Sequence, residues 1–374
     1  MSMRFTAAIN KPGFNPLGTQ TSSYAYNLFG WGRNGEGQIG LSNTLPYSSP
    51  KQVGSLTNWS VLSTGYMNTA VVTTDGKLWT WGNNGFGQLG LGNRTYYSSP
   101  KQVGALTTWA TVSTNASTLA IKTDGTLWSW GINFTGSLGL GNTTYYSSPK
   151  QVGALTNWAY AKAGYLSSFG IKTDGTLWSW GRNNYGQLGI GSVTNANSPV
   201  QVGALSNWLS VHFGAYSTIA VKTNGTLWSW GFNIYGTLGL GNTTYYSSPK
   251  QVGALTTWST ASIGGGRGAG AIKTDGTLWT WGGNGWGQRG NGNTTNSSSP
   301  AQVGALTNWL KIAGGYYNSL AIKTDGTLWA WGYNGNGQLG LGNNTAYSSP
   351  KQVGSSTTWL QVSPTDQGGV EALG

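Results

Sequence analysis

The sequence consists largely of one segment of about 50 residues that is repeated to the end of the chain. A representative copy of its core reads IKTDGTLWSWGINFTGSLGL from Ile121 to Leu140. The Trp-Gly pair that closes this core occurs seven times, at Trp31, Trp81, Trp130, Trp180, Trp230, Trp281 and Trp331. Periods of this length are typical of propellers and solenoids, in which each repeat needs its neighbours to cover its faces.

Each copy contains short runs of alternating side chains, separated by Gly, Asn, Asp, Ser and Pro, and this pattern predicts four short strands, A to D. In the third copy we expect these strands at residues 109–114, 118–123, 126–130 and 149–152. Between B and C, Asp124-Gly125 suits a tight hairpin, because Gly adopts positive φ angles without steric cost. Each copy is therefore predicted to be a four-stranded antiparallel meander.

The two ends of the chain carry complementary parts of one copy. The first copy has a C strand at 26–31 but no A or B strand, and the last copy ends with segments 359–362 and 370–373, which align with A and B. We therefore expect an all-β fold, a seven-bladed β-propeller of four-stranded antiparallel blades, closed by one blade shared between the N- and C-termini. Such closure removes the free sheet edges of an open array.

The copies follow the pattern G-x-x-x-(S/T)-x-A-(I/V)-K-T-(D/N)-G-T-L-W-(S/T)-W-G-x-N-x-x-G-(Q/T)-L-G, followed by S-P-K-Q-V-G. This pattern resembles the repeats of the regulator of chromosome condensation (RCC1-type) family, and the resemblance implies a seven-bladed propeller over residues 26–374. Residues 1–25 match no repeat position, and we interpret them as an N-terminal arm.

Composition excludes several classes of protein. The chain has no cysteine, so it has neither disulfides nor thiolate metal sites. No apolar run reaches the ~20 residues of a membrane span, and no signal peptide is evident. Only 7% of the residues are charged, and Asn, Thr, Ser and Gly dominate the polar residues. This composition favours a virion, cell-surface or extracellular location, with the cytoplasm as the alternative.

The net charge of +12 is distributed by the repeat. Five lysines lie in the K-T-(D/N)-G hairpins, and five others follow the Pro of strand D, as Lys101 and Lys150 do. Pro and Lys are typical of edge strands that resist further pairing. We therefore favour edge protection over a basic docking ring, and we do not expect nucleic acid as a partner.

The residue inventory argues against catalysis. The one histidine, His212, stands where other copies have mostly Ser, and five of the eight carboxylates occupy the same hairpin position. Turn geometry accounts for these Asp residues. The Gly-rich run around Arg267 lacks the Gly-Lys-Ser/Thr ending of a phosphate-binding loop, and we interpret it as a turn. We expect a non-enzymatic protein with no cofactor and no metal.

Variation among the copies is concentrated in the A–B turns and the first part of the C–D loops. Antiparallel strand order places both connections at one end of each blade, and aromatic residues and Arg are enriched at binding hot spots. We therefore predict a binding face there, with free drift of exposed loops as the alternative. Its residues are Arg33, Tyr66, Phe86, Phe134, Tyr165, Arg182, Tyr185, Tyr216, Phe232, Tyr235, Arg267, Trp286, Arg289, Tyr316, Tyr317 and Tyr333.

Three functions fit these features. The first is a surface-displayed propeller, namely a phage virion or tail-associated component that recognises a protein or a glycan, with the N-terminal arm docked to a larger assembly. The second is a regulatory protein-binding module implied by the resemblance, in guanine-nucleotide exchange or chromatin binding. These copies lack the inserted wedge and the A–B turn His of the members with exchange activity. The third is a secreted enzyme-inhibitor propeller.

Overall fold

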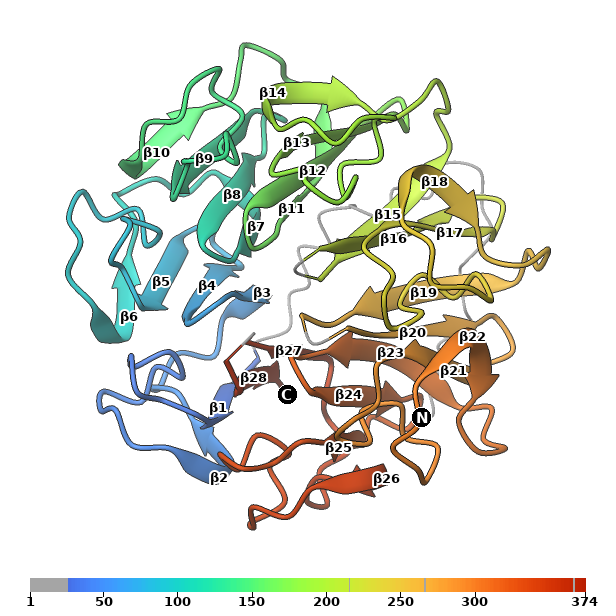
Figure 1. Ribbon diagram of the computed structural model, residues 1–374. Helices are drawn as coiled ribbons and strands as arrows, with labels where there is room; N and C mark the ends of the chain where they lie inside the picture. Colours follow the sequence, from blue (N-terminus) through green and yellow to red (C-terminus); the bar gives the residue numbers. More distant parts are fainter. Residues whose placement is uncertain (1–25, 215, 266, 366) are drawn as a thin grey trace, which may run out of the picture.

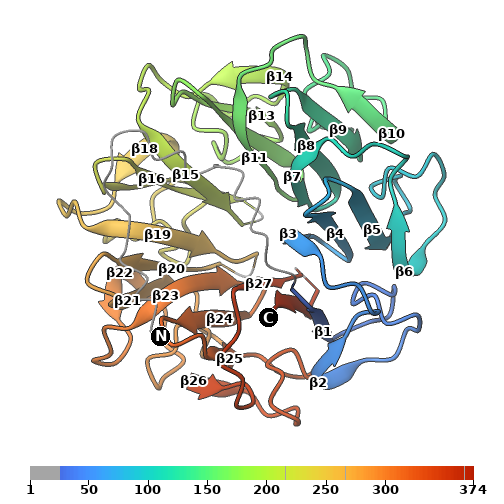
Figure 2. The same ribbon diagram turned by 180° about the vertical axis from the view of Figure 1, so that it is seen from behind.

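The computed structural model describes residues 26–214, 216–265, 267–365 and 367–374. Within these residues the chain forms 28 β-strands in seven four-stranded antiparallel sheets. The sheets are arranged as blades around a central axis, and the same ring is seen from behind in Figure 2 (Figures 1 and 2). No helix in the described residues is long and apolar enough to cross a membrane. The predicted seven-bladed propeller is confirmed.

Each blade runs from an innermost A strand to an outermost D strand (Figure 1). The A strands are β3 (Trp59–Thr64), β7 (Trp109–Thr114), β11 (Trp158–Ala163), β15 (Trp208–Phe213), β19 (Trp258–Ile263), β23 (Trp309–Gly314) and β27 (Gln361–Pro364). The B strands are β4 (Asn68–Thr73), β8 (Ser117–Lys122), β12 (Ser167–Lys172), β16 (Ser217–Lys222), β20 (Gly268–Lys273), β24 (Asn318–Lys323) and β28 (Gly369–Leu373).

The C and D strands form the outer half of each blade. The C strands are β1 (Leu28–Gly32), β5 (Leu78–Gly82), β9 (Leu127–Gly131), β13 (Leu177–Gly181), β17 (Leu227–Gly231), β21 (Leu278–Gly282) and β25 (Leu328–Gly332). The D strands are β2 (Tyr47–Gln52), β6 (Tyr97–Gln102), β10 (Tyr146–Gln151), β14 (Ala196–Gln201), β18 (Tyr246–Gln251), β22 (Ser297–Gln302) and β26 (Tyr347–Gln352).

One blade is built from both ends of the chain. Its strand order is β2-β1-β28-β27, so two strands come from each terminus. In the pairing of β1 with β28, Leu28 lies opposite Leu373 and Gly32 lies opposite Gly369. The predicted closure of the ring is therefore confirmed.

The D strands begin earlier than the sequence predicted. In the third copy the strand starts at Tyr146 rather than at residue 149, because the C–D pairing continues past an irregularity and Tyr146 pairs with Gly131. The predicted A strand of the last copy is also displaced, since β27 begins at Gln361 rather than at residue 359.

The hydrophobic core lies between neighbouring blades. In one cluster, Val72 and Leu78 of one blade pack with Trp109, Val112 and Trp130 of the next blade. The Trp109 and Trp130 rings meet edge to face with centroids 6.0 Å apart, a favourable geometry for aromatic pairs. Each blade thus depends on its neighbours for burial, as the repeat period predicted.

The hairpin lysines pack against tryptophans. The Lys122 Nζ atom lies 3.9 Å from the centroid of Trp128 and 5.2 Å from that of Trp109. Lys172, Lys222, Lys273 and Lys323 repeat this arrangement. Many D-strand lysines lie over a tyrosine of the same strand, as Lys101 does over Tyr97 at 5.4 Å. Most of the repeated positive charge therefore has an aromatic contact within the fold.

Serine hydroxyls join the A strands around the axis. The Ser63 Oγ accepts a hydrogen bond from the Thr114 N–H of the next blade at 3.0 Å, and Ser113 Oγ accepts one from the Ala163 N–H at 3.0 Å. The same position is Ala313 in β23, and its counterpart in the next blade is Pro364, which has no N–H to donate. The Ala313 position therefore leaves no donor without its usual acceptor, whereas Lys162 and His212 replace the serine in two other blades.

Candidate binding face

The A–B turns and the C–D loops lie together at one end of the blades. The backbone N–H of Asn83, in a C–D loop, donates to the carbonyl of Met67 in the A–B turn of the same blade at 2.9 Å. The same bond joins Arg182 to Leu166 at 2.9 Å and Tyr333 to Tyr317 at 3.0 Å. We call this end, formed by the A–B turns and the C–D loops, the loop face.

A buried asparagine holds each C–D loop. In the loop after β5, Asn84 is buried; its Oδ1 accepts the Leu89 N–H at 3.0 Å and its Nδ2 donates to the Thr95 carbonyl at 3.0 Å. The Gln88 Oε1 accepts the N–H of Phe86 at 2.9 Å. Equivalent bonds fix the backbone of Tyr185 and Trp286, so variable side chains stand on a repeated framework.

Each C–D loop is also bonded to the following blade. The Trp130 indole N–H donates to the carbonyl of Gln88 in the preceding blade at 3.0 Å, and the same bond recurs in all seven blades. Gly90 has a φ of 74°, and a Cβ atom at this position would lie 2.6 Å from the indole nitrogen of Trp130. This close approach requires glycine, and it locks the base of the loop against the neighbouring blade.

Part of the predicted face is a continuous aromatic cluster. The Tyr185 ring centroid lies 5.2 Å from those of Tyr216 and Phe232, and the rings of Phe232 and Tyr245 are 4.9 Å apart. The Arg182 guanidinium lies 5.2 Å from the Tyr216 centroid. These residues come from neighbouring blades, so the structure brings together side chains that are far apart in sequence.

Arg267 lies between this cluster and a second one. Its guanidinium is 4.3 Å from the centroid of Tyr235, and its backbone has a φ of 81°, which is uncommon for a residue other than glycine. Burial, together with the neighbouring Tyr317 hydroxyl, raises the pKa of Tyr316, and the nearby Arg267 charge partly opposes this shift. Arg267 is therefore close to tyrosines on either side of it.

The second cluster lies on the next blades. The Trp286 ring is 4.7 Å from that of Tyr333 and 6.4 Å from that of Tyr317, and the centroids of Tyr316 and Tyr317 are 4.4 Å apart. Trp286 keeps 46% of its surface exposed. A large aromatic side chain held by its neighbours yet exposed is typical of a binding hot spot.

The remaining predicted residues are more dispersed. The Tyr66 ring lies 5.5 Å from Tyr165, and the Arg33 Nη1 donates to the Gln367 Oε1 at 3.0 Å. Phe86 contacts Tyr145 with centroids 5.9 Å apart, whereas Phe134 is 52% exposed. These residues lie on the loop face outside the two clusters.

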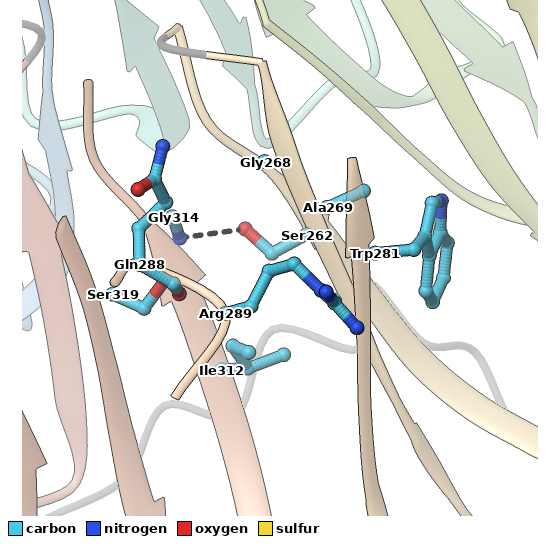
Figure 3. Close-up of a pocket in the computed structure, with 10 residues that line it drawn as sticks. Ser262, Gly268, Ala269, Trp281, Gln288, Arg289, Ile312, Gly314 and Ser319 are labelled. Carbon is cyan, nitrogen blue, oxygen red and sulfur yellow. Dashed lines mark hydrogen bonds between the residues drawn. The ribbon is translucent and has the colours of Figure 1, made fainter. Parts of the chain in front are cut away.

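Arg289 does not belong to the exposed surface, which corrects the sequence prediction. It is only 6% exposed, and Figure 3 shows it near Ser262 of its own blade and Ile312 of the next blade. Its Nη1 donates to the Thr295 carbonyl at 2.7 Å, its buried Nε has no partner, and burial lowers its pKa. Six other copies have Leu or Ile at this buried position, and that alignment was the signal that sequence reasoning missed.

Two further tyrosines were missed on the same face. Tyr145 contacts Phe86, and Tyr245 contacts Phe232 and Tyr185. Both belong to Tyr-Tyr pairs that recur in several copies, so a search for variable positions passed over them. Contact between the end of one C–D loop and the start of another becomes visible only in the folded ring.

Charge is sorted between the two ends of the propeller. The carboxylates of Asp124, Asp174, Asp275 and Asp325 lie in B–C hairpins, where each accepts hydrogen bonds from the Thr two residues later. Glu371 is buried in β28. Among the described residues, the loop face therefore carries Arg33, Arg94, Arg182 and Arg267 against one carboxylate, Glu36.

The opposite end also exposes apolar side chains. One leucine in each of six D–A connections is 41% to 49% exposed: Leu56, Leu106, Leu155, Leu205, Leu255 and Leu306. These residues are nearly identical from copy to copy and make no aromatic cluster. Exposed apolar side chains are therefore present at both ends of the propeller. The loop face is the candidate binding site because it also carries the contacting aromatic rings and the Arg residues.

In the part of the chain that the structure describes, no group of three or more His, Cys, Asp or Glu side chains is placed to hold a metal ion. His212 lies in the innermost strand β15, where burial and the charge of Lys162 lower its pKa to about 3.

The fold and the loop face define a class of protein: a closed propeller whose repeated framework carries diversified loops at one end. The chain belongs to the regulator of chromosome condensation (RCC1) repeat family. The family model matches residues 27–72, 75–116, 124–171, 174–221, 224–267, 275–322 and 325–364, and a second RCC1 repeat model matches 61–88 and 309–338.

Solved structures share this architecture. Human WBSCR16 is 21% identical with a TM-score of 0.83, over 93% of this chain and 98% of that chain. Yeast RCC1 (Prp20), solved bound to Kap60, is 18% identical with a TM-score of 0.86, over 100% of this chain and 94% of that chain. Prp20p from Saccharomyces cerevisiae, whose report describes binding to Gsp1p and histones, is 17% identical with a TM-score of 0.80, over 94% and 92%.

The TM-scores of these three structures establish the shared fold. No curated protein gives a significant sequence match to the chain.

Proposed function

We propose that this protein is a non-enzymatic binding module that recognises a protein partner through its loop face. The observation that carries the proposal is the run of aromatic rings from Tyr185 to Phe232, continued through Arg267 towards Trp286. The framework bonds fix the loop backbone, so little conformational freedom is lost on binding. Protein binding by the structurally similar yeast RCC1 (Prp20), in complex with Kap60, supports this class of function.

Charge suggests the chemistry of the partner surface. Arg182 and Arg267 lie beside tyrosine rings, an arrangement that leaves guanidinium N–H groups able to bind carboxylates. Glu36 is the one described carboxylate on this face, and the sequence adds Asp366 between β27 and β28, so Arg residues still outnumber carboxylates in the loop-face segments. We therefore propose a partner surface that combines apolar contacts with Asp or Glu side chains.

Other expectations have less support. The comparisons lend none to a phage virion or tail role, to a glycan partner, to a virion or surface location or to a secreted inhibitor. Guanine-nucleotide exchange and chromatin binding rest on the family resemblance. The predicted arm, residues 1–25, lies outside the described residues; we still propose that it docks to a larger assembly, and deleting it should abolish assembly while leaving the fold intact.

The experiment that tests the main proposal is a cross-linking map of the protein with its purified partner. A photoreactive residue is placed at Phe134 or at Asn336 on the loop face, and the matched control is placed at Thr107 or Thr156 in the D–A connections. Cross-links from the loop face alone support the proposal. Cross-links mainly from the D–A connections would assign binding to the leucine-bearing end instead.

A further inference from the structure

Arg267 has a backbone conformation that proteins usually reserve for glycine. In the part of the chain that the structure describes, Arg267 and Ser42 are the two residues other than glycine with a positive φ, and for Arg267 φ is 81°. This conformation costs free energy for a residue that carries a Cβ atom. Strained residues of this kind cluster at functional sites, so Arg267 is a candidate functional residue.

The blade shared between the two ends of the chain shows which residue this turn prefers. Four residues separate β19 from β20, and four separate β27 from β28, whereas the other five A–B turns have two or three. The Arg267 N–H donates to the Gly264 carbonyl at 3.4 Å. In the shared blade, the Gly368 N–H donates to the Thr365 carbonyl at 3.3 Å in the same way. Gly368 is thus the equivalent of Arg267, and its φ is 87°. Glycine adopts this conformation without steric cost, so the geometry of the turn does not account for an arginine.

The backbone of Arg267 is held in this conformation by its neighbours. Its carbonyl accepts the Gly283 N–H at 2.8 Å and the Thr237 hydroxyl of the preceding blade at 2.9 Å. The guanidinium lies 4.3 Å from the centroid of Tyr235, which also belongs to the preceding blade. The framework therefore fixes the strained residue and places its side chain against the neighbouring C–D loop.

The guanidinium of Arg267 keeps its N–H donors available. Arg267 is exposed, and among the described residues its guanidinium contacts the Tyr235 ring without a hydrogen bond or an ion pair. Partial burial and the neighbouring Tyr185 and Tyr235 raise the pKa of Tyr245, and the Arg267 charge partly opposes this shift. Arg267 is therefore close to the hydroxyls of two tyrosines. Guanidinium and hydroxyl donors on one surface bind carboxylate oxygens.

We propose that Arg267 is the specificity-determining residue of the loop face and binds the carboxylate of an Asp or Glu side chain of the partner protein. Tyr235 and Tyr245 would contact an aromatic side chain next to that carboxylate. This inference rests on the proposed function of the loop face. Arg182 also lies beside a tyrosine, but its φ is not positive, so no strain marks its position.

Two dipeptides that differ in one charge test this proposal. Binding of Ac-Trp-Glu-NH2 and of Ac-Trp-Gln-NH2 to the full chain is followed by NMR at constant ionic strength. We expect the Glu dipeptide to bind about tenfold more tightly or better, because a hydrogen bond to a charged group is the stronger one. Equal binding of the two dipeptides, or no binding of either, would overturn the proposal.

Variants assign the preference to one residue. R267Q should abolish the preference for Glu, whereas R182Q, which removes the same charge from the same face, should retain it. A preference that survives R267Q, or that R182Q reduces equally, would contradict the role of Arg267.

The variant R267G restores the glycine of the shared blade. It should lose the preference for Glu and melt at the same temperature as the parent or higher, because the strain is relieved. A lower melting temperature would show that the arginine serves the fold. The two proposals fail separately: cross-links mainly from the D–A connections would reject the loop face as the partner site, whereas an unchanged dipeptide preference in R267Q would reject only the role of Arg267.

Discussion

Trp31 and Val370 are direct partners in the antiparallel pairing of β1 with β28, so the last strand of the chain is hydrogen-bonded to the first. The Trp31 indole N–H also donates to the Gln338 carbonyl of the preceding blade at 3.1 Å. The ring is therefore closed both within the shared blade and between blades.

Deleting residues 359–374 removes β27 and β28 and leaves β1 and β2 without their sheet partners. It also exposes the faces of the two neighbouring blades. We expect aggregation or a large loss of stability, because open edges and apolar faces are exposed together. Thermal unfolding and size-exclusion chromatography measure this. A truncated chain that melts like the full one would contradict closure as a source of stability.

Glu371 gives the fold a pH dependence. It is fully buried, and burial raises its pKa well above the ordinary value, although Trp81 and Thr69 partly oppose the shift by hydrogen bonding. The folded state therefore binds a proton that the unfolded state loses above about pH 4.5. The resulting stabilisation is present below that pH and is lost as the pH rises towards the folded-state pKa.

Glu371→Gln should accordingly raise the free energy of unfolding at pH 7 by about 1 to 3 kcal/mol and flatten its dependence on pH above about 5. Melting temperature across pH 4 to 8 checks this, with Glu36→Gln on the loop face as the control. If Glu371→Gln loses the same stability at every pH, the carboxyl group stabilises the fold through its hydrogen bonds, and its burial does not cost stability at neutral pH.

Arg289 is a charged residue at a buried position where the six other copies have Leu or Ile. Its unpartnered Nε is a buried donor, which costs about 1 to 3 kcal/mol. Arg289→Leu restores the residue of most other copies and should stabilise the protein by about 1 kcal/mol, whereas Arg289→Ala should destabilise it by about 2 kcal/mol through the cavity it leaves. Chemical denaturation measures both. A destabilised Leu variant would show that the guanidinium stabilises the blade.

The inter-blade serine bonds provide a matched pair. Ser113→Ala leaves the buried Ala163 N–H without its acceptor and should cost about 1 to 2 kcal/mol. The reverse change, Ala313→Ser, faces Pro364 and should add nothing, because no N–H is present there. If Ser113→Ala lowers the free energy of unfolding and Ala313→Ser raises it by the same amount, the serine hydroxyl does not stabilise the protein through this bond to a backbone N–H.

Much of the fold was predictable because it depends on patterns repeated along the chain. The Trp-Gly period, the Asp-Gly hairpins and the complementary ends determine blade number, strand order and closure. Strand D was misplaced at its start, because its pairing resumes beyond an irregularity that the local sequence does not mark. The lysines over Trp128 and its equivalents were likewise not anticipated, since such contacts depend on side-chain direction.

The candidate site was predictable only in part. Antiparallel order was enough to place the A–B turns and C–D loops together. Strand order alone could not separate an exposed Arg267 from a buried Arg289; only the Leu or Ile that six other copies have at the Arg289 position indicates its burial. It also could not show that Tyr245 joins Tyr185, since this contact crosses from one blade to the next.

The central claim is that the loop face carries recognition, and replacing Phe86, Tyr185, Tyr235 and Trp286 together by Ala tests it most directly. Truncation of a buried interface aromatic costs about 2 kcal/mol or more in binding, whereas changes on an exposed loop usually alter stability by about 0.5 kcal/mol or less.

The measurement is partner affinity by calorimetry, together with the melting temperature of the same samples. The control carries Ala at Thr107, Thr156 and Thr256, in the D–A connections at the opposite end. The account predicts that the loop-face variant loses binding with a nearly unchanged melting temperature while the control binds normally. Loss of binding in the control, with the loop-face variant unaffected, would contradict it.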